Sequence, residues 1–271
     1  MIVPVIVGAT GSGKTGVSIE IAKALGRVEI VSADSRTIYK GMDVGTAKPT
    51  IKEREGIRHF GFDLVEPGER FTVKDWKDFC EQKINEIQQR GNVPIVVGGT
   101  GLYIDALVYD YQFEVEGKGY GKERGKCIKN LNGKSGSLEQ NDTAKYPDRQ
   151  KMCSMYKIFG IMWSSDELKE RLKKRAEQMF DNEELFLETR KLIQKYGLEA
   201  MARRGDVYKY AWKYLNGEIE KEEAINLCVT KDWHLAKRQM TWFKRNKNIC
   251  WLPLEKVYTT VLECIQNEQR K

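Results

Sequence analysis

Short apolar runs alternate with segments of helical periodicity along the first part of the chain. Residues 2–7 form a continuous apolar run that ends before a glycine, as expected of a buried parallel strand. Residues 14–25 carry apolar side chains at helical spacing and stop at Gly26. Further apolar runs follow at residues 28–33, 94–97 and 158–163, and a second helical segment covers residues 71–90. This order predicts an α/β fold with a parallel sheet and flanking helices.

The second half of the chain has a different pattern. Ser164 is followed three residues later by Glu167, which is a capping-box signature, and from Asp166 onward the periodicity is helical. Residues 117–134 break the pattern, because they are rich in glycine, lysine and arginine and contain too few apolar residues to bury a core. They form either a surface excursion or a basic flap over a polyanion. We therefore predict one core of residues 1–110 and 156–271, with a helical C-terminal part and a small inserted flap at residues 111–155.

Composition narrows the class of protein. The chain has 271 residues, of which 41% are hydrophobic and 31% charged, and no apolar stretch approaches the roughly 20 residues that span a membrane. The N-terminal apolar run leads into a glycine-rich motif instead of a cleavage site, so we expect a cytoplasmic protein that does not bind membranes. Six cysteines without a CxxC pair indicate reduced thiols, and two histidines argue against a histidine-rich metal site. The net charge of +7 favours an acidic partner only weakly.

The strongest chemical signal is the sequence GATGSGKT, which fits the pattern G-x-x-x-x-G-K-[ST] between a predicted strand and a predicted helix. Its glycines allow backbone N–H groups to surround phosphate oxygens, and the helix N-terminus adds positive potential. Lys14 supplies a charge, and the hydroxyl of Thr15 can ligate Mg²⁺. The motif predicts a phosphate site made of Gly8, Ala9, Thr10, Gly11, Ser12, Gly13, Lys14 and Thr15.

Two polar residues follow predicted strands at the same edge of the sheet. Asp34 comes after the second strand and Thr100 after the third, so both are expected beside the phosphate site. Asp34 is a candidate general base or a ligand of Mg²⁺ through water. Alternatively, each residue only stabilises its own turn, Asp34 as a cap and Thr100 through a bond to its own backbone.

Residues 235–247 mix basic and aromatic side chains in the sequence LAKRQMTWFKRNK. Basic and aromatic residues together suit a phosphate backbone with stacked bases. An amphipathic helix that buries its aromatic residues and leaves its charges in solvent explains the same pattern. The sequence alone favours the second explanation.

Taken together, these segments resemble the tRNA dimethylallyltransferase family. The N-terminal likeness comprises GATGSGKT, SADSRTIYKGMDVGTAKP at residues 32–49 and VGGTGLYIDAL at residues 97–107. The stretch DVGTAKP is the most specific of these, because general P-loop kinases lack it. Towards the C-terminus, AWKYLNGEIEKEEA at residues 211–224 and LAKRQMTWFKR at residues 235–245 also match. The resemblance covers about residues 1–110 and 156–252.

The resemblance implies transfer of a dimethylallyl group from dimethylallyl diphosphate to the exocyclic N6 amine of the adenosine 3′ of the anticodon in tRNA. Asp34 would hydrogen-bond this amine and collect its proton, with Thr100 near the target base. The P-loop and Mg²⁺ would stabilise the leaving diphosphate. Lys209, at the position of the family's GYK lysine, would add a second cation.

The resemblance also implies a partner, the anticodon arm of tRNA, whose target base must leave its stack. We expect the enzyme to act as a monomer. The residues expected to contact tRNA are Asp34, Ser35, Arg36, Thr37, Lys122, Arg124, Lys237, Arg238, Gln239 and Trp242.

Several departures from the family pattern leave more than one function open. Thr37 replaces the usual glutamine, Val207 replaces a glycine, and three acidic residues lie within positions 181–184. The insert at residues 111–155 is short where the family has a larger helical domain that clasps the anticodon arm. A short insert suits an adenylate dimethylallyltransferase that modifies free nucleotide. The chain also fits a small-molecule kinase, in which Asp34 deprotonates a hydroxyl, or a non-catalytic RNA-binding relic.

Overall fold

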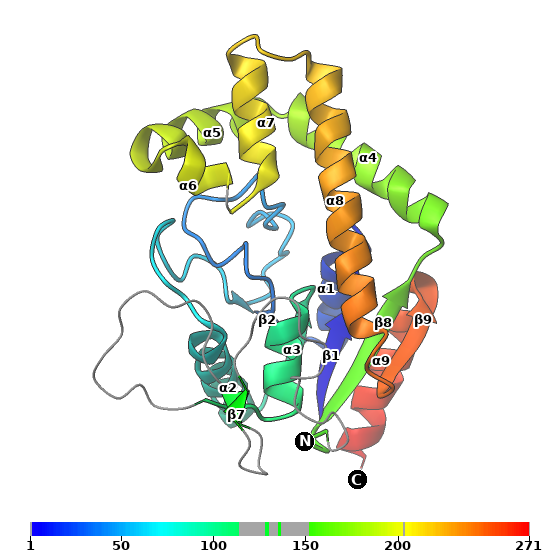
Figure 1. Cartoon of the computed structure of the whole chain (residues 1–271). Coiled ribbons are helices and arrows are strands. Elements are labelled where there is room, and N and C mark those ends of the chain that lie inside the picture. Colours follow the sequence, from blue (N-terminus) through cyan, green and yellow to red (C-terminus); the bar gives the residue numbers. More distant parts are fainter. Residues whose placement is uncertain (1, 114–127, 130–134, 137–151, 203, 271) are drawn as a thin grey trace, which may run out of the picture.

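The computed structural model describes residues 2–113, 128–129, 135–136, 152–202 and 204–270. Six strands form its central sheet in the order β3-β2-β4-β1-β8-β9, and every neighbouring pair is parallel (Figure 1). The strands are β1 (Val3–Val7), β2 (Val28–Ser32), β3 (His59–Phe60), β4 (Val93–Gly98), β8 (Tyr156–Met162) and β9 (Ile249–Pro253). The predicted parallel sheet is confirmed. Its interior strand β1 ends at the glycine-rich motif.

Helices cover both faces of this sheet. Successive side chains of a strand point to opposite faces, and in β1 all of them are apolar and buried. Val3, Val5 and Val7 of β1 belong to the apolar cluster that includes α2 (Val73–Gln89) and α3 (Gly101–Val108). Ile6 packs on the other face, in the cluster formed with α1 (Lys14–Leu25) and α9 (Leu254–Gln269). Each fully buried aliphatic side chain stabilises the fold by about 1.5–3 kcal/mol. The two clusters therefore fix the strand ends that form the site.

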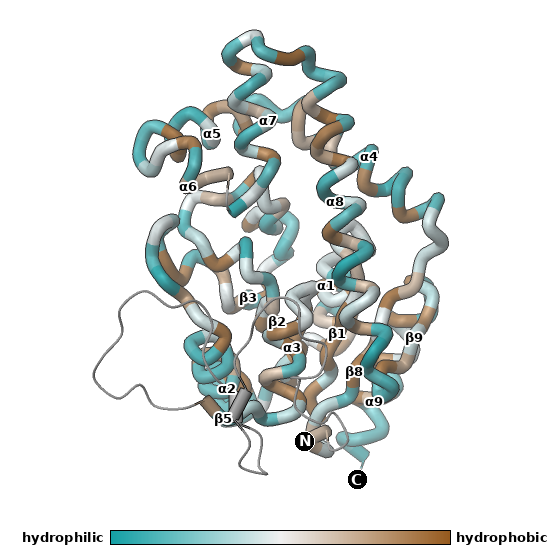
Figure 2. Tube along the Cα trace, in the orientation of Figure 1, coloured by the Kyte–Doolittle hydropathy of each residue, from teal (hydrophilic) through white to brown (hydrophobic). Residues whose placement is uncertain are grey.

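A separate group of helices, here called the helical part, lies above the carboxyl edge of the sheet (Figure 1). It consists of α4 (Ser165–Asp181), α5 (Glu183–Tyr196), α6 (Leu198–Ala202), α7 (Asp206–Leu215) and α8 (Lys221–Phe243). Its own apolar clusters include Phe180, Leu185 and Tyr210. The long helix α8 extends down to the sheet, where Phe243 joins the main core. In Figure 2, α2 and α4 show long hydrophilic stretches, whereas the strands of the sheet are mainly hydrophobic.

The described part of the insert contains three short antiparallel strands, β5 (Gln112–Phe113), β6 (Ile128–Lys129) and β7 (Ser135–Gly136). The remaining insert residues lie outside the described part of the chain. No described helix combines the length and the apolarity that crossing a bilayer requires. The five cysteines that the structure describes are free thiols.

Most predicted elements are confirmed, and two strands of the six-stranded sheet, β3 and β9, were not predicted. The helix predicted at residues 14–25 has those bounds, and Thr72 and Ser164 both form capping boxes. The predicted helical C-terminal part is confirmed, and it contains one strand, β9, which pairs with β8. β3 has only two residues and therefore gives no periodic signal.

Candidate active site

The glycine-rich motif forms a loop between β1 and α1 that encloses one end of a cavity of about 480 Å³, here called the donor cavity. Gly11 and Gly13 have φ angles of 74° and 90°, a left-handed conformation that favours glycine. Residues Thr10 to Thr15 all line the cavity. Gly8 and Ala9 are buried beneath it, and their carbonyl oxygens accept hydrogen bonds from Lys14 Nζ at 3.0 and 2.6 Å.

Lys14 is held inside this loop rather than in solvent. Burial of its ammonium lowers the pKa of Lys14 from the ordinary value to about 8. The charge of Asp34 opposes that shift, and the charge of Arg175 adds to it. The pKa of Lys14 therefore lies close to physiological pH. A bound polyanion would stabilise the protonated form.

Helix α4 supplies a basic wall opposite the loop. Arg171, Lys174 and Arg175 line the donor cavity. Arg175 Nη1 donates to Thr10 Oγ1 at 2.7 Å, and Arg171 Nε donates to the carbonyl oxygen of Gly11 at 2.9 Å. Arg175 Nε is buried without a hydrogen-bond partner among the described residues. This guanidinium is thus placed to bind an anion that sits on the loop.

Lys209 does not take the position predicted for it. Its side chain is exposed on α7, between the buried Tyr208 and Tyr210, and it does not line the donor cavity. Successive helical residues point about 100° apart. The orientation of α7 that buries Tyr208 therefore directs Lys209 into solvent. The second cation beside the loop is Arg175. The spacing of Arg171 and Arg175, four residues apart after a capping box, was the signal that could have identified it.

Asp34 lies at the carboxyl edge of the sheet, as predicted, and lines the donor cavity. One of its carboxylate oxygens accepts the backbone N–H of Arg36 at 2.8 Å. Thr100 Oγ1 accepts the backbone N–H of Ser35 at 2.9 Å and lies 3.2 Å from Ser35 Oγ. Thr100 lines neither this cavity nor the one beside it, so its visible role is to hold the segment that carries Asp34.

The residues after Asp34 are divided between two cavities. Thr37 is buried and lines the donor cavity, where its hydroxyl contacts Ser32 Oγ and the carbonyl oxygen of Asp34, both at 3.3 Å. Ser35 and Arg36 line a separate cavity of about 290 Å³, here called the second cavity. Thr37 therefore belongs to the donor side, although the sequence grouped it with residues that contact RNA.

The donor cavity also has an apolar side. Ile30, Phe62 and Val97 line it together with Ala47 and Pro49 of the DVGTAKP loop, here residues 43–49. His59 lies there too, and burial lowers the pKa of its imidazole, which favours the neutral form. This side can accommodate a small hydrocarbon group next to a bound diphosphate.

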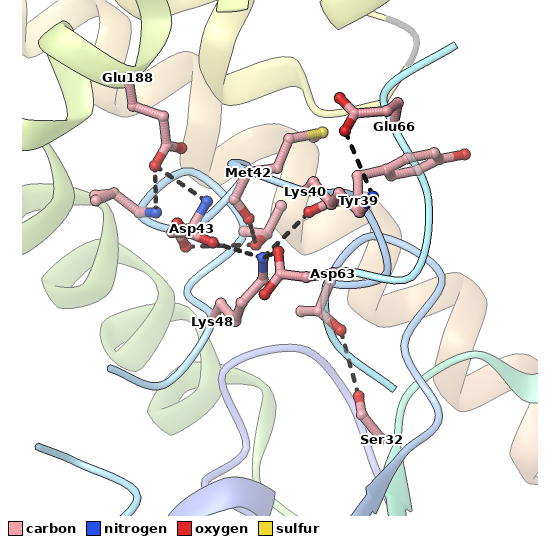
Figure 3. Close-up of polar contacts among 12 residues, drawn as sticks. Ser32, Tyr39, Lys40, Met42, Asp43, Lys48, Asp63, Glu66 and Glu188 are labelled. Carbon is pink, nitrogen blue, oxygen red and sulfur yellow. Dashed lines mark hydrogen bonds and ion pairs between the residues drawn. The ribbon is translucent and has the colours of Figure 1, made fainter. Parts of the chain in front are cut away.

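Glu188 of α5 holds the DVGTAKP loop in place. Its carboxylate accepts three successive backbone N–H groups, those of Asp43, Val44 and Gly45, at 2.9–3.0 Å. Tyr208 also donates its hydroxyl to Glu188, at 2.7 Å. Figure 3 shows Glu188 pointing from the helical part toward this loop. Hydrogen bonds to a carboxylate are stronger than neutral ones, so the helical part positions one wall of the donor cavity.

A buried lysine secures the same loop from below. The Lys48 side chain is 2% exposed, and its ammonium lies 2.5 Å from Asp43 and 2.7 Å from Asp63. It also donates to the carbonyl oxygen of Tyr39 at 3.1 Å (Figure 3). This use of the lysine in DVGTAKP is structural. The sequence identified the motif without indicating its contacts.

The basic and aromatic segment of α8 is largely an amphipathic helix. Gln239 accepts the backbone N–H of Thr10 at 2.8 Å and donates to the carbonyl oxygen of Gly99 at 3.0 Å, so it links two loops of the site. Trp242 Nε1 donates to Asp105 at 2.8 Å. Lys237 and Arg238 are exposed. The polar groups of Gln239 and Trp242 form hydrogen bonds within the protein. An RNA contact by Lys237 or Arg238 stays a prediction. Lys122 and Arg124 lie outside the described residues.

The donor cavity suits a magnesium ion that is bound mainly by its substrate. Among the described residues, no group of three or more His, Cys, Asp or Glu side chains could hold a metal. Thr15, at the start of α1, and Asp34 both line the cavity. Mg²⁺ is commonly held by one or two protein groups together with phosphate oxygens and water. The residues present fit that arrangement.

Comparisons with known proteins agree with this architecture. The family model described as IPP transferase matches residues 37–142 and 124–246. A tRNA dimethylallyltransferase of Acetivibrio thermocellus is 36% identical, over 92% of this chain and 90% of that protein. Two solved structures of tRNA isopentenylpyrophosphate transferases are also similar. The one from Bacillus halodurans has a TM-score of 0.74 and 27% identity, and covers 98% of this chain and 96% of its own.

The other structure, from Staphylococcus epidermidis, has a TM-score of 0.73 and 28% identity, and 99% of each chain is covered. These likenesses extend through the sheet and the helical part, which together form the donor cavity. The chain therefore belongs to the IPP transferase family, the family of the tRNA dimethylallyltransferases.

Proposed function

We propose that this protein transfers a dimethylallyl group from dimethylallyl diphosphate to tRNA, at the N6 amine of the adenosine 3′ of the anticodon. The observation that carries the proposal is one cavity that combines the P-loop, the α4 guanidinium groups, an apolar side and Asp34. The diphosphate occupies the P-loop end, and the hydrocarbon tail lies against Ile30 and Val97. The family relationship supports tRNA as the acceptor.

In the reaction, the bond between the allylic carbon and the diphosphate oxygen breaks as the adenine nitrogen forms its bond to that carbon. Negative charge grows on the leaving diphosphate, where Lys14, Arg175 and the backbone N–H groups of the P-loop stabilise it. The nitrogen becomes positively charged and loses its proton to Asp34. The electron pair of the broken bond leaves with the diphosphate, so no oxidant or reductant is required.

Magnesium is proposed as the cofactor, with the hydroxyl of Thr15 as the protein group that would hold it. When bound, the ion supplies positive charge to the leaving diphosphate. We also propose that the enzyme acts as a monomer in the cytoplasm. Sedimentation of the purified protein tests its oligomeric state.

A transfer assay with radiolabelled dimethylallyl diphosphate and Mg²⁺ tests the proposal. Tritium or carbon label in tRNA, at the adenosine 3′ of the anticodon after nuclease digestion, is the expected result. Label that appears only in AMP would instead identify an adenylate dimethylallyltransferase. Consumption of ATP by the protein, with no prenyl transfer to either acceptor, would favour a small-molecule kinase. Folded protein that gives neither activity would contradict the proposed enzyme.

A further inference from the structure

The second cavity lies on the other side of the chain segment that carries Asp34. Residues 34–39 form the shared wall, because Asp34 and Thr37 line the donor cavity whereas Ser35, Arg36 and Tyr39 line the second cavity. Within the described part of the chain, no lining residue is common to both. Side chains of this one segment thus face two separate cavities. The second cavity, of about 290 Å³, lies directly beside Asp34, the residue proposed to act on the acceptor.

Aromatic rings and guanidinium groups dominate the chemistry of this compartment. Tyr39, Phe71 and Tyr103 line it together with Arg36 and Arg204. The Tyr103 ring is stacked on Trp76 at 4.6 Å between centroids and 11° between planes, which fixes its orientation. Aromatic and guanidinium planes are the surfaces on which proteins stack unpaired RNA bases.

Arg204 is arranged to present a donor to a ligand. Its guanidinium carbon lies 5.0 Å from the centre of the Tyr39 ring, and its Nη1 donates to the carbonyl oxygen of Ala200 at 2.9 Å. Its Nε is buried without a hydrogen-bond partner among the described residues. A buried donor that lacks a partner is costly, so a ligand acceptor at this point would satisfy it.

Asp206 indicates that the second cavity would accept a nucleobase and not a phosphate group. This aspartate also lines the second cavity, and its ion pair with Lys231 is a long one, at 4.0 Å. A carboxylate repels phosphate but accepts hydrogen bonds from the amino group of a nucleobase. A pocket that offers rings, a guanidinium donor and a carboxylate acceptor matches the edge and faces of a base.

We propose that the second cavity binds the base of a nucleotide immediately next to the target adenosine, unstacked from its neighbours and held against Tyr39 and Arg204. This inference rests on the proposed function, since it concerns the RNA whose adenosine reaches Asp34. Thr100 holds Ser35, which lines the second cavity, through two hydrogen bonds. Binding the neighbouring base would hold the target nucleotide in its extruded position.

A cycle of protein and RNA changes tests the inference. Single-turnover transfer is measured for the wild-type protein, Arg204→Ala and Tyr39→Leu. The acceptors are an anticodon stem-loop and two copies with an abasic nucleotide on the 5′ or the 3′ side of the target. Stacking is worth about 1–3 kcal/mol per base, which corresponds to about 5- to 150-fold in kcat/KM. Each variant and one abasic RNA should show a loss in this range.

The decisive expectation is that these losses do not multiply. One of the two abasic RNAs lacks the base that would occupy the second cavity. Replacing the intact RNA by this abasic RNA should lower kcat/KM much less for Arg204→Ala and Tyr39→Leu than for the wild type. The KM for dimethylallyl diphosphate should stay unchanged in both variants, which shows that the donor cavity is intact. Arg190→Ala, which removes an exposed arginine from α5, is the matched control and should behave like the wild type.

Losses that multiply at both flanking positions, with an active wild type, would overturn the inference and leave the proposed function standing. Equal losses for Arg190→Ala would also overturn it, because they would indicate a general charge effect. Failure of the wild type to modify any of the RNAs would overturn the proposed function and this inference together.

Discussion

The two sides of the donor cavity are built in different ways. One side is the P-loop, which connects a buried strand to its helix, lines the cavity with residues 10–15 and owes its conformation to local glycines. The opposite side combines α4 with the DVGTAKP loop, and the latter is held by Glu188, 143 to 145 residues further along the chain. The first side is local in sequence, whereas the second depends on tertiary packing. Changes to the two sides should therefore have different effects.

The largest effect is expected on the local side. Lys14→Met removes the only P-loop ammonium, and loss of one such stabilising group costs about 10²–10³-fold in kcat. Because the change is confined to the loop, the midpoint of thermal unfolding should fall little. Steady-state transfer and calorimetry measure both quantities. Lys23→Met, on the exposed end of the same helix, is the control and should retain activity.

Arg175→Ala tests the basic wall of α4. The change removes a charged hydrogen-bonding group worth about 1.5–3 kcal/mol, so kcat/KM should fall about 10- to 150-fold. Lys173→Ala, an exposed neighbour on α4, is the matched control. Lys209→Ala should have almost no effect on the KM for dimethylallyl diphosphate. A larger loss for Lys209→Ala than for Arg175→Ala would contradict our assignment of the second cation.

Glu188→Gln tests the tertiary side. An amide has one acceptor oxygen and adds an N–H₂ donor, so it cannot satisfy three backbone N–H groups and Tyr208 together. We expect the free energy of unfolding to fall by about 1–3 kcal/mol and the KM for dimethylallyl diphosphate to rise about 5- to 20-fold. Glu184→Gln, one turn earlier and exposed, should leave both unchanged. If only stability fell, Glu188 would support the fold without shaping the cavity.

The smallest effect concerns pH. Since burial lowers the pKa of Lys14 to about 8, this group loses its charge as pH rises through that value. Diphosphate binds the protonated form, so its dissociation constant should increase about fourfold between pH 7 and pH 8.5. Isothermal titration with inorganic diphosphate, in buffers of different ionisation enthalpy, should also detect proton uptake at the higher pH. A flat profile would mean that Lys14 stays charged in the free enzyme.

The same contrast explains how far the sequence could predict the structure. The P-loop, the bounds of α1 and both capping boxes follow from contacts within a few residues, and they were predicted. Lys209 was misplaced because motif matching does not define which face of α7 packs inward. Arg175 and Glu188 were missed because their roles depend on Thr10 and on the DVGTAKP loop, which are distant in sequence. For the same reason, the sequence did not indicate that Thr37 lines the donor cavity, and an RNA contact by Thr37 stays a prediction.

The most direct test of the central claim separates donor binding from transfer. For Asp34→Asn, equilibrium binding of labelled dimethylallyl diphosphate and single-turnover transfer to tRNA are measured on the same preparation. We predict donor affinity within a few-fold of the wild type and transfer slower by about 10²–10⁴-fold, because an amide cannot accept the proton of the adenine amine. Transfer at nearly the wild-type rate, or a loss of donor binding as large as the loss of transfer, would contradict it.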